Sequence, residues 1–487
     1  MTSAKTSKTL YDLNSLLSVA NVLICGIIIC LYYIKDDNGI VNIFTLLLGC
    51  LFAIENIGML SYEKRRRNPF ILILVLVVTV FYMARIATIL HVPTSASLFG
   101  NNFITSAKDL NYALIFILLS NASMFLGFYI GRKNNASLKK MTCEDDHVPK
   151  INNALIIINL CVLVQFFNLI NPETFGRLTG YVQTIFFNQQ IIFLFAFTLL
   201  AYHYNKISLR IRTLFIVMFL AIVLLITLSG SRSGVLTVSM LLLMGILAVN
   251  QRIMISKKII LICLIIIPIS MIFFVTATVK RGLGIKDTIT VKHLYMINEH
   301  KYRLKHHLAL IYYRLGFIDY STELIANRQK FARIINGQYY VKSIIDNVLT
   351  PGFDVFGTPR ASHALSYVIR GESIPDKDQV ALNYQADQMG IYGEYYVLFY
   401  GYPALAAFFL LACIFQGVFN AIETRNILLS CMYRAVLLNL FYIYINSFGT
   451  DWFALNIVIT VITTFLFGRY FVSNRKRKFV FMIESKR

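Results

Sequence analysis

The sequence predicts an all-α polytopic membrane protein, and three observations lead to this fold class. Hydrophobic residues make up 57% of the 487 residues, and only 14% are charged; a soluble domain carries about 25% charged residues. Many apolar stretches are about 20 residues long, the length that crosses a bilayer as a helix. A β-barrel would instead show short segments of alternating hydrophobicity.

A window of about 19 residues finds about twelve candidate transmembrane helices. They cover approximately 14–34, 40–60, 70–91, 110–131, 152–170, 186–204, 211–229, 234–250, 258–278, 396–420, 427–447 and 452–472. The first is too long for the core of a cleaved signal peptide, and no small-residue cleavage site follows it. We therefore interpret it as a retained signal anchor.

Basic residues predict the orientation of these spans. They follow the second, fourth, sixth, eighth and twelfth spans, in "YEKRRRNP", "GRKNN", "NKISLRIR", "QRIMISKK" and "NRKRK". Lys and Arg in short loops favour the cytoplasmic side. We therefore expect a multi-pass protein with both termini in the cytoplasm.

One long connection divides the predicted chain into three regions. Residues 1–278 form an N-terminal transmembrane region of about nine helices, 279–395 a large extracytoplasmic loop, and 396–487 a C-terminal region of about three helices with a basic tail. Amphipathic stretches and the Gly/Pro breaks in "TPGFDVFGTPR" predict that the loop folds as a cap of short helices on the membrane. A loop of this length is usually functional.

The net charge of +22 would suggest nucleic acid in a soluble protein. Here the charges fall between membrane spans, so lipid headgroups or an anionic substrate are the expected partners. No basic, aromatic-rich soluble domain is present, which excludes nucleic-acid binding. The 8 cysteines lack metal-ligand spacing, and no phosphate-binding P-loop occurs, so no cofactor is predicted.

Several basic residues fall on the predicted outer face and are candidates for binding a diphosphate. They are Arg177, Arg232, Lys280, Arg281, Arg314 and Arg360. A guanidinium makes two parallel charge-assisted hydrogen bonds to phosphate oxygens. The Gly and Ser residues beside Arg232, in "LSGSRSG", also let backbone N–H groups approach an anion. Contact with phospholipid headgroups, or a snorkelling arginine, is the alternative explanation.

Glu394 and His363 are the candidate catalytic bases. Glu394, in "GIYGEYYVLFYGYP", lies where the loop re-enters the membrane, and a carboxylate there is costly unless it is paired or functional. Both catalysis and pairing with an arginine remain open. His363, in "RASHALSY", has the pKa range of a general base, although a structural role is also open. Asp376 and Asp378 have Asp-x-Asp spacing, but such turns are usually solvated and we expect no metal site.

The order of these features resembles the Wzy family of O-antigen and oligosaccharide repeat-unit polymerases. The resemblance rests on "LSGSRSG" in an outside hairpin, on the large late loop, and on "GEYYVLFYGYPAL" leading that loop back into a span. "RASHALSYVIRG" also has the Arg-x10-Gly spacing of some members. Related O-antigen ligases typically have a His near Asn before the final spans, and "LNYQADQMG" lacks it.

The resemblance implies a C-type membrane glycosyltransferase in a bacterial plasma (inner) membrane. Its substrates would be an undecaprenyl-diphosphate-linked glycan donor and acceptor, and arginines would stabilise the leaving diphosphate in place of a metal. It leaves open a chain-length regulator as a protein partner, and whether the product is O-antigen, capsule or exopolysaccharide. Two alternative functions stay open: an O-antigen ligase, and a lipid-linked oligosaccharide flippase or sugar transporter.

Overall fold

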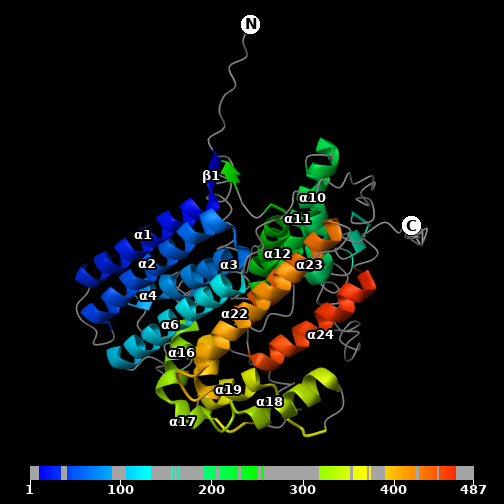
Figure 1. The fold of residues 1–487 in the computed structure, drawn as a ribbon. Coiled ribbons are helices and arrows are strands. Elements are labelled where there is room, and N and C mark those ends of the chain that lie inside the picture. Colours follow the sequence, from blue (N-terminus) through cyan, green and yellow to red (C-terminus); the bar gives the residue numbers. More distant parts are fainter. Residues whose placement is uncertain are drawn as a thin grey trace, which may run out of the picture.

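The computed structural model shows a bundle of long helices with short helices gathered at one end (Figure 1). It describes residues 10–34, 41–89, 106–132, 190–204, 208–228, 232–250, 254–256, 317–350, 355–369, 372–374, 390–422, 427–446 and 449–467, together with residues 155, 156, 159, 160 and 163.

The first half of the described chain is almost entirely helical. Its elements are β1 (Leu10–Asp12), α1 (Leu13–Ile34), α2 (Ile43–Arg66), α3 (Pro69–Val77), the π-helix η1 (Val78–Met83), α4 (Ala84–Ile89), α6 (Ala107–Gly131), α10 (Gln190–His203), α11 (Leu209–Leu228), α12 (Arg232–Asn250) and β2 (Met254–Ser256). The side chains of Asn42, Asn68 and Ser106 accept backbone N–H bonds at the starts of α2, α3 and α6. These residue types favour the N-cap position because they satisfy otherwise unpaired N–H groups.

The second half contains the short helices that we call the cap helices, followed by three longer ones. The cap helices are α16 (Phe317–Ala326), α17 (Arg328–Phe331), α18 (Gly337–Ile344) with its π-helical extension η2 (Ile345–Leu349), α19 (Ala361–Ile369) and α21 (Ile391–Leu398). The longer helices are α22 (Ala404–Ala421), α23 (Ile427–Ile445) and α24 (Thr450–Phe467).

Within the described residues, six helices are long and apolar enough to cross a membrane. They are α1, α2, the continuous helix Pro69–Ile89 formed by α3, η1 and α4, α6, α22 and α23. This confirms an α-helical chain with membrane-spanning character. Four further predicted spans overlap the helices α10, α11, α12 and α24, which are not among these six, so they stay predictions. The spans predicted at 152–170 and 258–278 fall almost wholly outside the described residues.

The tenth predicted span, 396–420, is wrong at its start. Helix α22 begins only at Ala404, and α21 is a separate helix that ends at Leu398. Tyr400 has a φ of 56° and Gly401 a φ of 108°, a region that interrupts a right-handed helix. Pro403 then provides the N-cap of α22. This break lets α21 lie among the cap helices instead of continuing as a span.

Contacts between distant helices define two ends of the bundle. The C-terminal ends of α2, α6 and α22 lie together, because Asn68, just after α2, donates to Gln416 at 2.7 Å, and Asn420 donates to the Gly131 carbonyl at 3.1 Å. We call this the basic end. At the opposite end, the Tyr112 hydroxyl near the start of α6 bonds the Tyr396 hydroxyl of α21 at 2.9 Å. Figure 1 shows the cap helices α16 to α19 there, opposite to β1.

The apolar cores follow the same division. The largest core of buried side chains runs through the long helices. A smaller core joins α16, α17, α18, α19 and α21, and a third joins η2 to α24. The cap helices therefore have a core of their own and rest on the end of the bundle, where the candidate site lies.

Candidate functional site

Glu394 lies on α21, between the cap core and the start of α24. Its side chain is only 1% exposed. One carboxylate oxygen, Oε1, accepts hydrogen bonds from the Tyr340 hydroxyl, from the Thr450 backbone N–H at 2.7 Å and from the Thr450 hydroxyl at 2.7 Å. These donors are all neutral, so the arginine pairing considered from the sequence is not what holds Glu394 in the described part of the chain.

The surroundings of Glu394 change its proton affinity. Burial raises the pKa of this carboxyl above its ordinary value, the hydrogen bonds from Tyr340 and Thr450 oppose the rise, and the nearby Asp451 adds to it. Burial and the Glu394 charge also raise the pKa of Tyr340, which therefore stays a protonated donor. A carboxylate with a raised pKa accepts a proton more readily near neutral pH than an ordinary one.

Asp451, in the first turn of α24, is a second buried acid that the sequence analysis missed. It is 1% exposed. Its Oδ2 accepts from the Ser343 hydroxyl at 2.7 Å and from the Ala361 N–H at 2.7 Å, and Oδ1 accepts from the Trp452 N–H at 2.8 Å. Asp451 thus ties α18, the start of α19 and α24 together. A signal existed in "FGTDWF", where an acid precedes the chain's one Trp at the start of an apolar run.

Arg360 and His363 come from the segment that Asp451 holds. The Arg360 guanidinium carbon lies 4.9 Å from the centre of the Trp452 ring, which is cation–π geometry. His363 is buried in the first turn of α19. Of the predicted site residues, Glu394, His363 and Arg360 therefore lie where the cap helices meet α24.

The other predicted phosphate-binding residues are not part of this described cluster. Arg232 is the first residue of α12, and its side chain lies outside the described part of the chain. The same holds for all atoms of Arg177, Lys280, Arg281 and Arg314, and for Asp376 and Asp378. The convergence of these cations on one anion remains a prediction.

The position of Arg232 along the bundle can still be inferred from the backbone. α12 ends at Asn250, and β2 follows at Met254 and pairs antiparallel with β1, which leads directly into α1. Asn250 therefore lies towards the end of the bundle where α1 begins. This is the basic end, because Asn14 of α1 donates to Glu63 near the end of α2. Arg232, at the opposite end of α12, begins the helix on the side of the cap helices.

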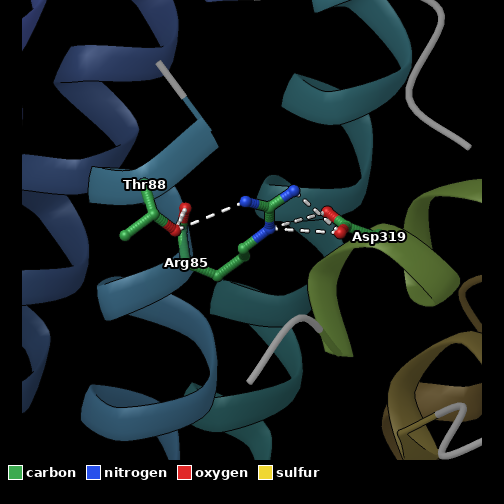
Figure 2. Close-up of polar contacts among 3 residues, drawn as sticks. All are labelled: Arg85, Thr88 and Asp319. Carbon is green, nitrogen blue, oxygen red and sulfur yellow. Dashed lines mark hydrogen bonds and ion pairs between the residues drawn. The ribbon is translucent and has the colours of Figure 1, made fainter. Parts of the chain in front are cut away.

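Arg85, a buried arginine in the continuous helix Pro69–Ile89, pairs with an acid of the cap helices. Figure 2 shows its guanidinium facing the Asp319 carboxylate of α16. The Arg85 Nη2 lies 3.0 Å from Asp319 Oδ2, and both side chains are 1% exposed. Burial raises the pKa of Asp319, and the Arg85 guanidinium opposes that rise. This ion pair fastens the cap helices to the third span.

The arrangement offers a buried proton acceptor, a second carboxylate and a stacked guanidinium at the end of the membrane helices. Among the described residues, no group of three or more His, Cys, Asp or Glu side chains could hold a metal ion. No protein-family model, curated protein or solved structure matches this chain.

Proposed function

We propose that this chain is a membrane glycosyltransferase that polymerises undecaprenyl-diphosphate-linked oligosaccharide repeat units. In this proposal the helices form a C-type architecture in a bacterial plasma membrane, with the basic end in the cytoplasm and the cap helices outside. The observation that carries the proposal is the buried Glu394 cluster at the junction of cap and membrane helices, because a lipid-linked sugar would present its reacting atoms at that depth.

Glu394 is the proposed general base. It removes the proton from an acceptor sugar hydroxyl as the oxygen forms a bond to the anomeric carbon of the donor glycan. The bond between that carbon and the diphosphate oxygen breaks, and undecaprenyl diphosphate leaves with the electron pair. A positioned base of this kind contributes about 10²–10⁴-fold to a rate.

Cations stabilise the leaving diphosphate in this proposal. Arg360 is held near the cluster by Trp452, and Arg232 begins α12 on the same side of the bundle. A guanidinium placed where negative charge develops supplies the electrostatic stabilisation that is often the largest catalytic contribution. Lys280, Arg281, Arg314 and Arg177 remain additional candidates, and His363 remains the alternative base.

The test is polymerisation by the purified protein with lipid-linked repeat units as the sole glycan. We expect a ladder of products for the wild type, and a rate at least about 100-fold lower for Glu394→Gln. The matched control is Glu372→Gln, which changes an exposed cap glutamate and should leave the ladder intact. Wild-type-like ladders from Glu394→Gln would remove this residue from the mechanism.

The same assay separates the alternative functions. A ligase would attach glycan to a lipid-A core without lengthening it, and a flippase or sugar transporter would produce no larger glycan. Repeating the reaction in excess chelator tests whether the arginines act without a metal, because a metal-independent polymerase keeps its rate.

A further inference from the structure

Two arginines at the basic end of the bundle have buried nitrogen atoms without a hydrogen-bond partner in the described part of the chain. They are Nη1 of Arg132, the residue that caps α6, and Nε of Arg434 on α23. Neither residue belongs to the cluster at the cap. Buried guanidinium nitrogens almost always donate to an oxygen, so these two indicate a ligand acceptor.

Contacts of neighbouring residues place Arg132 and Arg434 near the same end of α22. The guanidinium carbon of Arg434 lies 5.2 Å from the centre of the Phe419 ring. The next residue, Asn420, donates to the carbonyl of Gly131 at 3.1 Å, and Gly131 directly precedes Arg132. Arg132 and Arg434 therefore approach one short stretch of α22 from the two helices that flank it.

Polar and aromatic side chains join the helix ends near these arginines. Asn68 donates to Gln416 at 2.7 Å, and Gln416 donates to Asn420 at 2.9 Å, which forms a polar ladder across the ends of α3, α22 and α6. Below it, the Phe70 ring contacts the rings of Phe419 and Phe441, with centroids 5.2 Å apart in each case. The side-chain amides of this ladder bond one another and a backbone carbonyl. They are therefore not the acceptors of the two arginine nitrogens, which remain available to an external anion.

A helix C-terminus attracts cations by itself, and this explains why an arginine can reside at the end of α6. The last carbonyls of a helix can also accept a hydrogen bond from an arginine side chain, but Nη1 of Arg132 has no such partner in the described part of the chain. The neighbouring residues at the end of α2, Lys64, Arg65, Arg66 and Arg67, are exposed and also cationic. They add to a positive potential that attracts anions to this end.

We propose that Arg132 and Arg434 form a phosphate-binding site at the basic end of the bundle. The ligand is a phosphate group, carried either by an anionic phospholipid or by free phosphate. Arginine suits it because the guanidinium fork matches two phosphate oxygens. This site lies at the opposite end from Glu394, so it does not depend on the proposed polymerase activity.

Native mass spectrometry of the full-length protein in detergent tests the site with three probes: dioleoyl phosphatidylglycerol, inorganic phosphate, and dioleoylglycerol, which has the same acyl chains without phosphate. We expect one phosphatidylglycerol to bind at least about tenfold more tightly than dioleoylglycerol. Arg434→Gln and Arg132→Gln should each weaken that binding about tenfold. Arg434→Lys should weaken it less than Arg434→Gln, because lysine keeps the charge and loses only the guanidinium fork. Arg210→Gln changes an exposed arginine at the start of α11 and is the matched control, with no change expected.

Displacement of the lipid by millimolar inorganic phosphate would assign the site to free phosphate, and persistence of the lipid would assign it to a headgroup. Either result supports the site. Equal binding of phosphatidylglycerol and dioleoylglycerol, or unchanged lipid affinity in Arg132→Gln, would overturn it. The unfolding temperature without ligand is measured for each variant, and Arg132→Gln, at a helix end, carries the test if Arg434→Gln does not fold.

Discussion

At the scale of single residues, the chemistry of the cap junction depends on how Glu394 and Asp451 differ. Glu394 has one oxygen held by three neutral donors, whereas Asp451 uses both oxygens to fix the backbone of α19 and α24 and the hydroxyl of Ser343. Both acids join three elements, and they differ in that the hydrogen bonds of Glu394 within the described residues use one oxygen, which leaves the other to accept a proton. Glu394 is therefore the better candidate base, and Asp451 acts through the residues that it positions.

Replacement of Tyr340 by Phe tests this assignment through the pH dependence of the reaction. The Tyr340 hydrogen bond stabilises the charged form of Glu394 and so lowers its pKa. Its loss should raise that pKa further, and the ascending limb of the pH–rate profile should move to higher pH in Tyr340→Phe. Tyr339→Phe is the control, because the Tyr339 hydroxyl donates to the Pro359 carbonyl instead. A shift of equal size in both variants, or a shift to lower pH in Tyr340→Phe, contradicts Glu394 as the base.

At the scale of elements, the cap helices are joined to the bundle by a few specific polar links. The Arg85–Asp319 pair joins α4 to α16, the Tyr112–Tyr396 bond joins α6 to α21, and Asp451 joins α24 to α18 and α19. Polar links of this kind are directional, so they fix how the cap sits on the bundle as well as holding it there.

Removal of Asp319 should therefore destabilise the protein strongly. Asp319→Ala removes the carboxylate that the buried Arg85 guanidinium faces, and breaking a buried ion pair by removing one partner costs about 3–5 kcal/mol of unfolding free energy. The double variant Arg85→Leu with Asp319→Leu removes both charges and should recover most of that loss. Denaturant unfolding in detergent, followed by circular dichroism, measures both. If the double variant is as unstable as Asp319→Ala, the loss comes from packing and the ion pair is not its cause.

At the scale of the whole molecule, the sequence predicts the long helices well but not the contacts around Glu394, for a physical reason. An apolar run is a local property, and the first predicted span, 14–34, differs by one residue from α1, Leu13–Ile34. The partnership of Glu394 with Tyr340 and Thr450 joins residues 54 and 56 positions apart, and no local pattern encodes such a contact. The sequence singles out Glu394 because it is an acid where the loop re-enters the membrane. Asp451 directly precedes a predicted span, so it reads as the boundary of an apolar run.

The final prediction concerns the orientation of the whole protein in the membrane. The helix ends that carry Lys64, Arg65, Arg66 and Arg132 lie together, and the cap helices lie at the other end. From the preference of short basic loops for the cytoplasm we predict that the whole cap lies outside. A polymerase requires this orientation, because its lipid-linked substrates are presented on the outer face.

Single cysteines at the two ends test the orientation in cells. Glu372→Cys marks an exposed cap position and Arg66→Cys an exposed position at the basic end, and each is compared with the parent protein to correct for its own cysteines. A membrane-impermeant maleimide should label Glu372→Cys in intact spheroplasts and Arg66→Cys only after permeabilisation. A cysteine at the end of α6 or α22 should show the same labelling as Arg66→Cys, because the contacts between α2, α6 and α22 hold those ends together. Labelling of Arg66→Cys alone in intact spheroplasts would place Glu394 on the cytoplasmic side, where no repeat unit has yet been flipped, and the polymerase proposal would fail.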